Sequence, residues 1–140
     1  MVCDRASNAI MYFVLSIVYP NYSFVFYMCF LLDFGSHFLQ FISSASTGAH
    51  HKGKNSKENW LVSLYYNNSA VFQIVVGGAE ISTACLYLCG KSPEHVPGPL
   101  FLVLTAFLTL IMAFKMFVNV FQWFGAIERL SALDASRKGD

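Results

Sequence analysis

The stretch Phe30-Leu31-Leu32-Asp33-Phe34-Gly35-Ser36-His37-Phe38 decides the fold, because it places an acid and an imidazole inside an apolar run that is long enough to span a membrane. Asp33 and His37 are about one helical turn apart, so a helix presents both on the same face. A carboxylate near the centre of a bilayer helix costs about 2.5–3.5 kcal/mol on insertion scales and normally faces a partner or a polar cavity. The pair therefore predicts a polar site inside a membrane-embedded bundle.

The overall composition indicates the same environment. Of the 140 residues, 56% are hydrophobic and 12% are charged, whereas a soluble domain carries about 25% charged residues. The net charge of +1 argues against a nucleic-acid binder, which needs a basic surface to displace counterions from phosphate. The four cysteines lie in or beside apolar runs, so we interpret them as small buried hydrophobes. We predict an integral membrane protein that binds no nucleic acid.

Apolar runs predict an all-α, multi-pass membrane helix bundle with about four transmembrane helices. We expect these helices at about residues 6–19, 22–42, 61–89 and 100–127. A span needs about 20 residues, so the first run barely crosses the membrane even with Val2 and Cys3 added, as if its beginning were missing. The third run is long enough to span with tilt or to begin with an interfacial turn around residues 65–68.

The basic residues predict the orientation. A polar connection at about residues 43–60 carries three lysines, which marks its side as cytoplasmic by the positive-inside rule. With four spans, both termini are then cytoplasmic, including the polar tail at about residues 128–140. Lys91 lies on the opposite side in a short proline-rich loop, and Lys115 lies within the membrane.

Polar residues near the cytoplasmic side predict one cavity that opens to the cytoplasm. Asp4 lies at the start of the first run, and His37 is nearer than Asp33 to the cytoplasmic end of the second run. Lys52 and Tyr65 complete the candidate set. For Asp33 and His37 the alternative is a hydrogen-bonded pair that only holds the bundle together.

Two further charges lie deep in the third and fourth runs. Glu80 and Lys115 either belong to a site or pair with each other between neighbouring helices. The sequence leaves both interpretations open.

An ordered series of short motifs resembles one known family and covers nearly all of the chain. In order, the motifs are Asp4-Arg5, Tyr19-Pro20, Leu32-Asp33-x-x-Ser36-His37, His51-Lys52, Leu64-Tyr65-Tyr66, Glu80, Leu86-Tyr87-Leu88, Lys115 and Ala132-Leu133-Asp134. Their order and spacing resemble the C-terminal two-thirds of the eukaryotic, phosphatidylinositol-forming branch of the CDP-alcohol phosphatidyltransferase family. The resemblance implies that residues 1–140 form the C-terminal part of the family's membrane domain, matching helices 3 to 6 of its six-helix fold.

The family pattern is D-G-x-x-A-R-x8-G-x3-D-x3-D. Its four aspartates hold divalent metal against the CDP diphosphate, and the last is proposed to deprotonate the attacking hydroxyl, which suits phosphoryl transfer. Only the last aspartate has a match in this chain, and the match is Asp4. The resemblance thus implies Asp4 as catalytic base and metal ligand, with Mg²⁺ or Mn²⁺ as the cofactor. Because the other three aspartates have no match, we expect an N-terminally truncated chain with little or no activity alone.

The reaction that the resemblance implies transfers a phosphatidyl group from CDP-diacylglycerol to myo-inositol and releases CMP. It takes place at the cytoplasmic face of the endoplasmic reticulum membrane. Asp33, His37, Lys52 and Tyr65 are then candidates for the inositol-side or lipid-side wall of the substrate-binding site. Because the family commonly forms dimers, a homodimer is the expected assembly.

Two other functions stay open at the level of the sequence. One is a non-catalytic tetraspan membrane protein that associates with a full-length enzyme of the family. The other is an unrelated transporter or channel subunit in which Asp33, Glu80 and Lys115 line a pathway.

Overall fold

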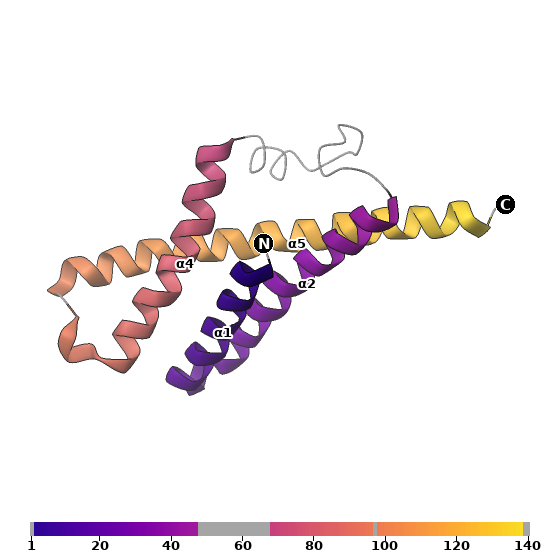
Figure 1. The fold of residues 1–140 in the computed structure, drawn as a ribbon. Coiled ribbons are helices and arrows are strands. Elements are labelled where there is room, and N and C mark those ends of the chain that lie inside the picture. Colours follow the sequence, from indigo (N-terminus) through magenta and orange to yellow (C-terminus); the bar gives the residue numbers. More distant parts are fainter. Residues whose placement is uncertain (1, 48–67, 97, 139–140) are drawn as a thin grey trace.

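The computed structural model describes residues 2–47, 68–96 and 98–138, and they form helices joined by short turns (Figure 1). The α-helices are α1 (Val2–Val18), α2 (Ser23–Thr47), α4 (Ser69–Lys91) and α5 (Gly98–Lys138). Short 3-10 helices at Pro20–Tyr22 and Pro93–His95 form the two turns. No strand occurs in these three ranges. The predicted all-α class is confirmed.

The helix ends differ in detail from the apolar runs. α4 begins at Ser69, because the side-chain oxygen of Asn68 accepts hydrogen bonds from the backbone amides of Ala70 at 3.1 Å and Val71 at 3.4 Å. These bonds satisfy amides that have no partner within the helix. α5 continues to Lys138, so the polar segment expected after residue 127 is helical that far.

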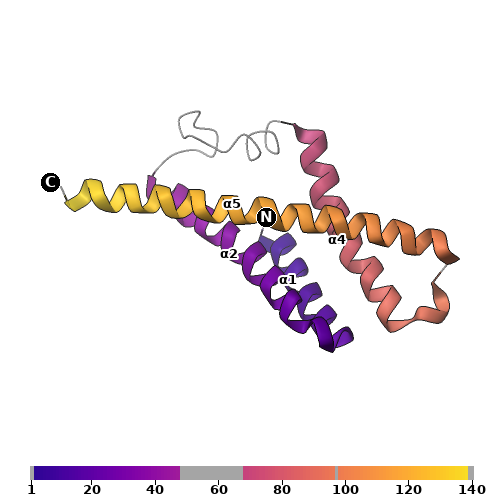
Figure 2. The same cartoon turned by 180° about the vertical axis from the view of Figure 1, so that it is seen from behind.

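The helices pack in a ring. α5 contacts α2 and α4, and α1 also contacts α2 and α4. Figures 1 and 2 show α1 and α2 side by side and antiparallel, with α5 passing across the bundle as its longest helix. All four helices contribute side chains to one apolar core, which comprises Tyr12, Leu15, Phe26, Cys29, Ala79, Met112 and Met116.

Among the described residues, three segments are long and apolar enough to cross a membrane: Pro20–Ser46, Ser69–Lys91 and Gly98–Ala135. Ala6–Val18 is a shorter apolar helix, in agreement with the short first run. At about 1.5 Å per residue, a helix as long as α5 extends about 60 Å, whereas the hydrocarbon core is about 30 Å thick. α5 therefore exceeds one membrane thickness, and its polar C-terminal turns suit an aqueous environment.

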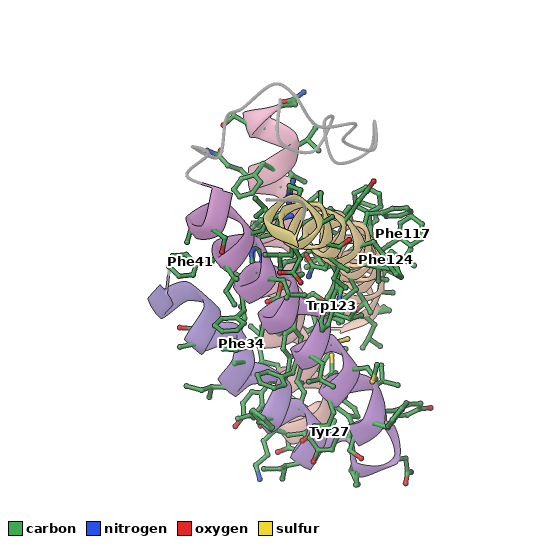
Figure 3. The ribbon with its side chains drawn as sticks, turned by 90° about the vertical axis from the view of Figure 1, so that its right-hand side faces the viewer. Tyr27, Phe34, Phe41, Phe117, Trp123 and Phe124 are labelled. Atoms are coloured by element: carbon green, nitrogen blue, oxygen red, sulfur yellow. The ribbon has the colours of Figure 1, made fainter. Side chains whose placement is uncertain are left out.

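The bundle carries apolar side chains outside and many polar side chains inside. Phe41 of α2 and Phe117 and Phe124 of α5 are exposed, and Figure 3 shows them at the outer faces of these helices. In the described part of the chain, the buried polar residues include Asn8, Ser16, Asp33, Ser36, Ser43, Ser82, Thr83, Thr105, Lys115, Asn119 and Gln122. Lipid accepts exposed apolar surface, and polar side chains join membrane helices from within. This distribution supports the predicted membrane protein.

Two glycines allow helices and turns to approach closely. Gly35 of α2 faces the ring of Trp123 on α5, where an added Cβ would lie 2.7 Å from Cη2 of the ring; Figure 3 shows Trp123 between the two helices. Gly90 of α4 makes room for Tyr19, whose hydroxyl donates a hydrogen bond to the carbonyl oxygen of Leu86 at 2.8 Å. Burial, with a smaller contribution from nearby Cys89, raises the pKa of the Tyr19 hydroxyl above its ordinary value.

Candidate functional site

A buried ion pair joins α2 to α5 at the centre of the candidate site. The Lys115 ammonium nitrogen lies 3.1 Å from Oδ1 of Asp33, and the two residues are only 1% and 3% exposed. The side-chain amide of Asn119, one turn after Lys115, donates to the same carboxylate oxygen at 3.0 Å. A buried charge without a partner is very costly, so this network fixes how α2 and α5 pack.

His37 extends the network towards the surface. Its Nε2 lies 3.8 Å from Oδ1 of Asp33, and the His37 side chain is 21% exposed whereas that of Asp33 is 4% exposed. The prediction that the two side chains share one helix face is confirmed. In this arrangement the carboxylate is enclosed by protein, and the imidazole is the more exposed member of the pair.

The partner of Lys115 was not predictable from the sequence. Pairing with Glu80 was one open interpretation, but the structure pairs Lys115 with Asp33 instead. Glu80 lies on α4 and lines a different part of the bundle, facing α1. Two of the three residues suggested to line a transporter or channel pathway, Asp33 and Lys115, are therefore bound to each other in an ion pair between helices.

A second polar contact joins α2 to α5 nearer the end of α2. Arg129 donates from Nη2 to the side-chain oxygen of Gln40 at 2.7 Å and from Nε to the hydroxyl of Ser43 at 3.2 Å. The Gln40 amide in turn donates to the backbone carbonyl of Gln122 at 3.3 Å. Arg129 lies in the tail that the sequence analysis expects to be cytoplasmic, and no local pattern indicates these partners.

The other predicted site residues are placed only in part. Asp4 belongs to α1, but its side chain lies outside the described part of the structure, as do Lys52 and Tyr65 altogether. Among the described residues, no group of three His, Cys, Asp or Glu side chains is placed to hold a metal ion. The described side chains thus do not by themselves fit the divalent metal that the resemblance implies.

The sequence of this chain is similar to the sequences of several known proteins. Over 157 residues the chain is 29% identical to CDP-diacylglycerol–inositol 3-phosphatidyltransferase of Schizosaccharomyces pombe, a match that covers 99% of this chain and 66% of the relative. It is 30% identical over 136 residues to the Candida albicans protein of the same name, covering 96% of this chain and 57% of the relative. The chain is similar to phosphatidylinositol synthases along nearly its whole length. This confirms the resemblance found in the motifs.

The similarity extends to animals. The human protein of that name is 28% identical over 142 residues, which cover 97% of this chain and 65% of the relative. The chain therefore spans between 57 and 66% of the length of these three relatives. No family model and no solved structure matches the chain.

Proposed function

We propose that this chain forms part of a phosphatidylinositol synthase-like transferase, which transfers a phosphatidyl group from CDP-diacylglycerol to myo-inositol and releases CMP. The observation that carries the proposal is the similarity over 99% of the chain to a protein named for this reaction. The membrane-type helices are consistent with a lipid substrate. We further propose the endoplasmic reticulum membrane as its location, with both termini in the cytoplasm, and a homodimer as its assembly.

Asp33 and His37 take different roles in this proposal. Asp33 is enclosed and already bound by Lys115 and Asn119, which supports a positioning role for its carboxylate. His37 is more exposed beside it, which supports contact of its imidazole with a substrate hydroxyl or phosphate. Lys52 and Tyr65 join the substrate-binding wall by the motif resemblance alone.

The proposed role of Asp4 rests on the family pattern, in which the corresponding aspartate deprotonates the alcohol. A carboxylate next to the attacking hydroxyl favours this step because it accepts the proton as the new bond to phosphorus forms. The resemblance also implies Mg²⁺ or Mn²⁺ with Asp4 as one ligand.

A fusion protein tests the proposal. The whole chain is fused to the part of the Schizosaccharomyces pombe relative that the match does not cover, and CMP release is measured in membranes with CDP-diacylglycerol and inositol. We expect inositol-dependent release from the fusion and little from the chain alone, because the chain supplies one of the four pattern aspartates. His37→Ala should raise the inositol concentration needed for half-maximal rate at least several-fold.

Lys91→Ala is the matched control, because Lys91 is exposed at the end of α4 and away from the network. It should leave the inositol dependence unchanged. Unchanged kinetics in His37→Ala, in protein that inserts in the membrane like the parent, would remove His37 from the substrate-binding wall.

A further inference from the structure

An apolar groove lies between α2 and α5 on the outer side of the bundle. It has a volume of about 340 Å³ and is lined by Met28, Leu31, Leu32, Val120, Trp123 and Phe124. Met28, Leu31 and Phe124 are 40%, 50% and 66% exposed, and Figure 3 shows Phe124 at the outer face of α5. All six residues lie in segments that are long and apolar enough to cross a membrane. The groove therefore opens towards the lipid.

The groove lies directly beside the close approach of α2 and α5 at Gly35. Leu32 precedes Gly35 by about one helical turn, so both residues lie on the same face of α2. Gly35 packs against the ring of Trp123, where an added Cβ would lie 2.7 Å from Cη2. The side chain of Trp123 thus contacts α2 and also lines the groove. Whatever fills the groove packs against a ring that holds α2 on α5.

The lining of the groove restricts the chemistry of its occupant. None of the six lining side chains is charged, so the groove offers no group that would hold a phosphate or a sugar. Walls without neighbouring atoms lose van der Waals contacts, which favours an occupant that follows their shape. The volume is near the lower end of the range for small-molecule sites, about 300–1,000 Å³. A single flexible hydrocarbon chain meets these conditions.

A second membrane helix fits the groove poorly. Helices in membranes approach each other through small residues such as Gly, Ala, Ser and Thr, and all six lining side chains are larger than these. A helix with its side chains is about 10–12 Å wide, so a stretch about 10 Å long occupies roughly 800–1,100 Å³. That is more than twice the volume of the groove.

We propose that the groove binds one acyl chain of a bulk phospholipid of the bilayer, as a structural lipid between α2 and α5. The donor lipid of the proposed reaction also carries acyl chains, but the groove has no group that recognises its nucleotide. A site that contacts only the chain is filled by mass action, and bulk phospholipids are the main source of chains in a bilayer. The lipid site does not depend on the transfer reaction.

Tryptophan fluorescence of the full chain tests the lipid site. The chain has two tryptophans, Trp60 and Trp123, so Trp60→Phe leaves the groove residue as the only indole. This protein is purified in dodecylmaltoside micelles and titrated with phosphatidylcholine whose acyl chains carry bromine, which quenches indole fluorescence on contact. We expect quenching that saturates as the groove fills and that unbrominated phosphatidylcholine reverses.

Matched variants separate the groove from the rest of the lipid-facing surface. Leu31→Phe and Val120→Phe, combined in one protein, fill the groove from both helices. Leu110→Phe and Val103→Phe, also combined, make the same two changes at positions of α5 that are 70% and 66% exposed and do not line the groove. The first pair should raise the half-saturating lipid concentration at least tenfold, and the second should leave it within twofold. Circular dichroism and size-exclusion chromatography check that each protein is folded.

Two results with folded protein would overturn the lipid site: quenching proportional to added lipid without saturation, or the same half-saturating concentration in both paired variants. Two further results would replace the occupant. Displacement of the brominated lipid at least tenfold more effectively by CDP-diacylglycerol than by phosphatidylcholine with the same chains would assign the groove to the donor lipid. A dimeric parent whose quenching decreases as protein concentration rises would assign it to a second copy of the chain.

Discussion

The substitution Lys115→Met isolates the buried ion pair between α2 and α5. It removes the ammonium group 3.1 Å from Asp33 and leaves a side chain of similar length in a position that is 1% exposed. Asp33 keeps the Asn119 hydrogen bond at 3.0 Å but loses its full countercharge. Removal of one partner of a buried ion pair costs about 3–5 kcal/mol, and we expect a value near the lower end because Asn119 remains.

The free energy of unfolding is measured by titration with sodium dodecyl sulfate in dodecylmaltoside micelles, followed by far-ultraviolet circular dichroism. The double variant Asp33→Asn/Lys115→Met replaces the ion pair with neutral groups and should recover most of the loss, because such replacements are often neutral. The double-mutant cycle should therefore give a coupling free energy of at least about 2 kcal/mol.

Lys91→Met is the control for the loss of a lysine, since Lys91 is exposed and should change stability by no more than about 0.5 kcal/mol. A loss of less than about 1 kcal/mol in Lys115→Met would refute the view that this pair fixes the packing of α2 on α5. Additive losses in the double variant would refute it as well.

Three further predictions use the same unfolding assay. Gly35→Ala should lower the free energy of unfolding by about 1–3 kcal/mol, because the added methyl group overpacks against Trp123. Gly125→Ala is the control and should not lower it, because there is open space around the added Cβ. Equal losses in the two variants would contradict the close approach of α2 and α5 at Gly35. Tyr19→Phe should lose about 0.5–1.5 kcal/mol with the hydrogen bond to α4. The pKa of Tyr19 is raised from 10.0 in the folded state. The difference in free energy of unfolding between the parent and Tyr19→Phe should therefore be complete below pH 10 and decrease as the pH rises through the folded-state pKa. A difference that grows with pH would contradict this. Asn68→Ala should lower the free energy of unfolding by about 1 kcal/mol, because it removes the side-chain cap of α4. Faster amide hydrogen exchange in the first turn of α4 would check this.

The class of the fold and the shared face of Asp33 and His37 were predictable because both depend on local periodicity. A run of apolar residues predicts a helix in lipid, and a spacing of four predicts neighbours on its surface. The end of α5 was harder to predict. Hydropathy falls after residue 127, but residues such as Ala126, Glu128 and Leu130 favour helix and carry α5 to Lys138.

The partners across helices could not be predicted in the same way. Asp33 and Lys115 lie on separate helices far apart in the sequence, and their pairing depends on how α2 crosses α5. Packing of this kind is set by side-chain shape along both helices, including the space that Gly35 leaves for Trp123. The buried residue Asn8 could have been singled out from the sequence, since it is a polar residue one turn after Asp4 in an apolar run.

CMP release by the fusion of this chain to the uncovered part of the Schizosaccharomyces pombe relative tests the central claim most directly. The account predicts CMP release that requires both CDP-diacylglycerol and myo-inositol and that falls to background in Asp4→Asn. A fusion that is inserted in the membrane and folded, yet releases no CMP or releases it equally with Asp4→Asn, would contradict it.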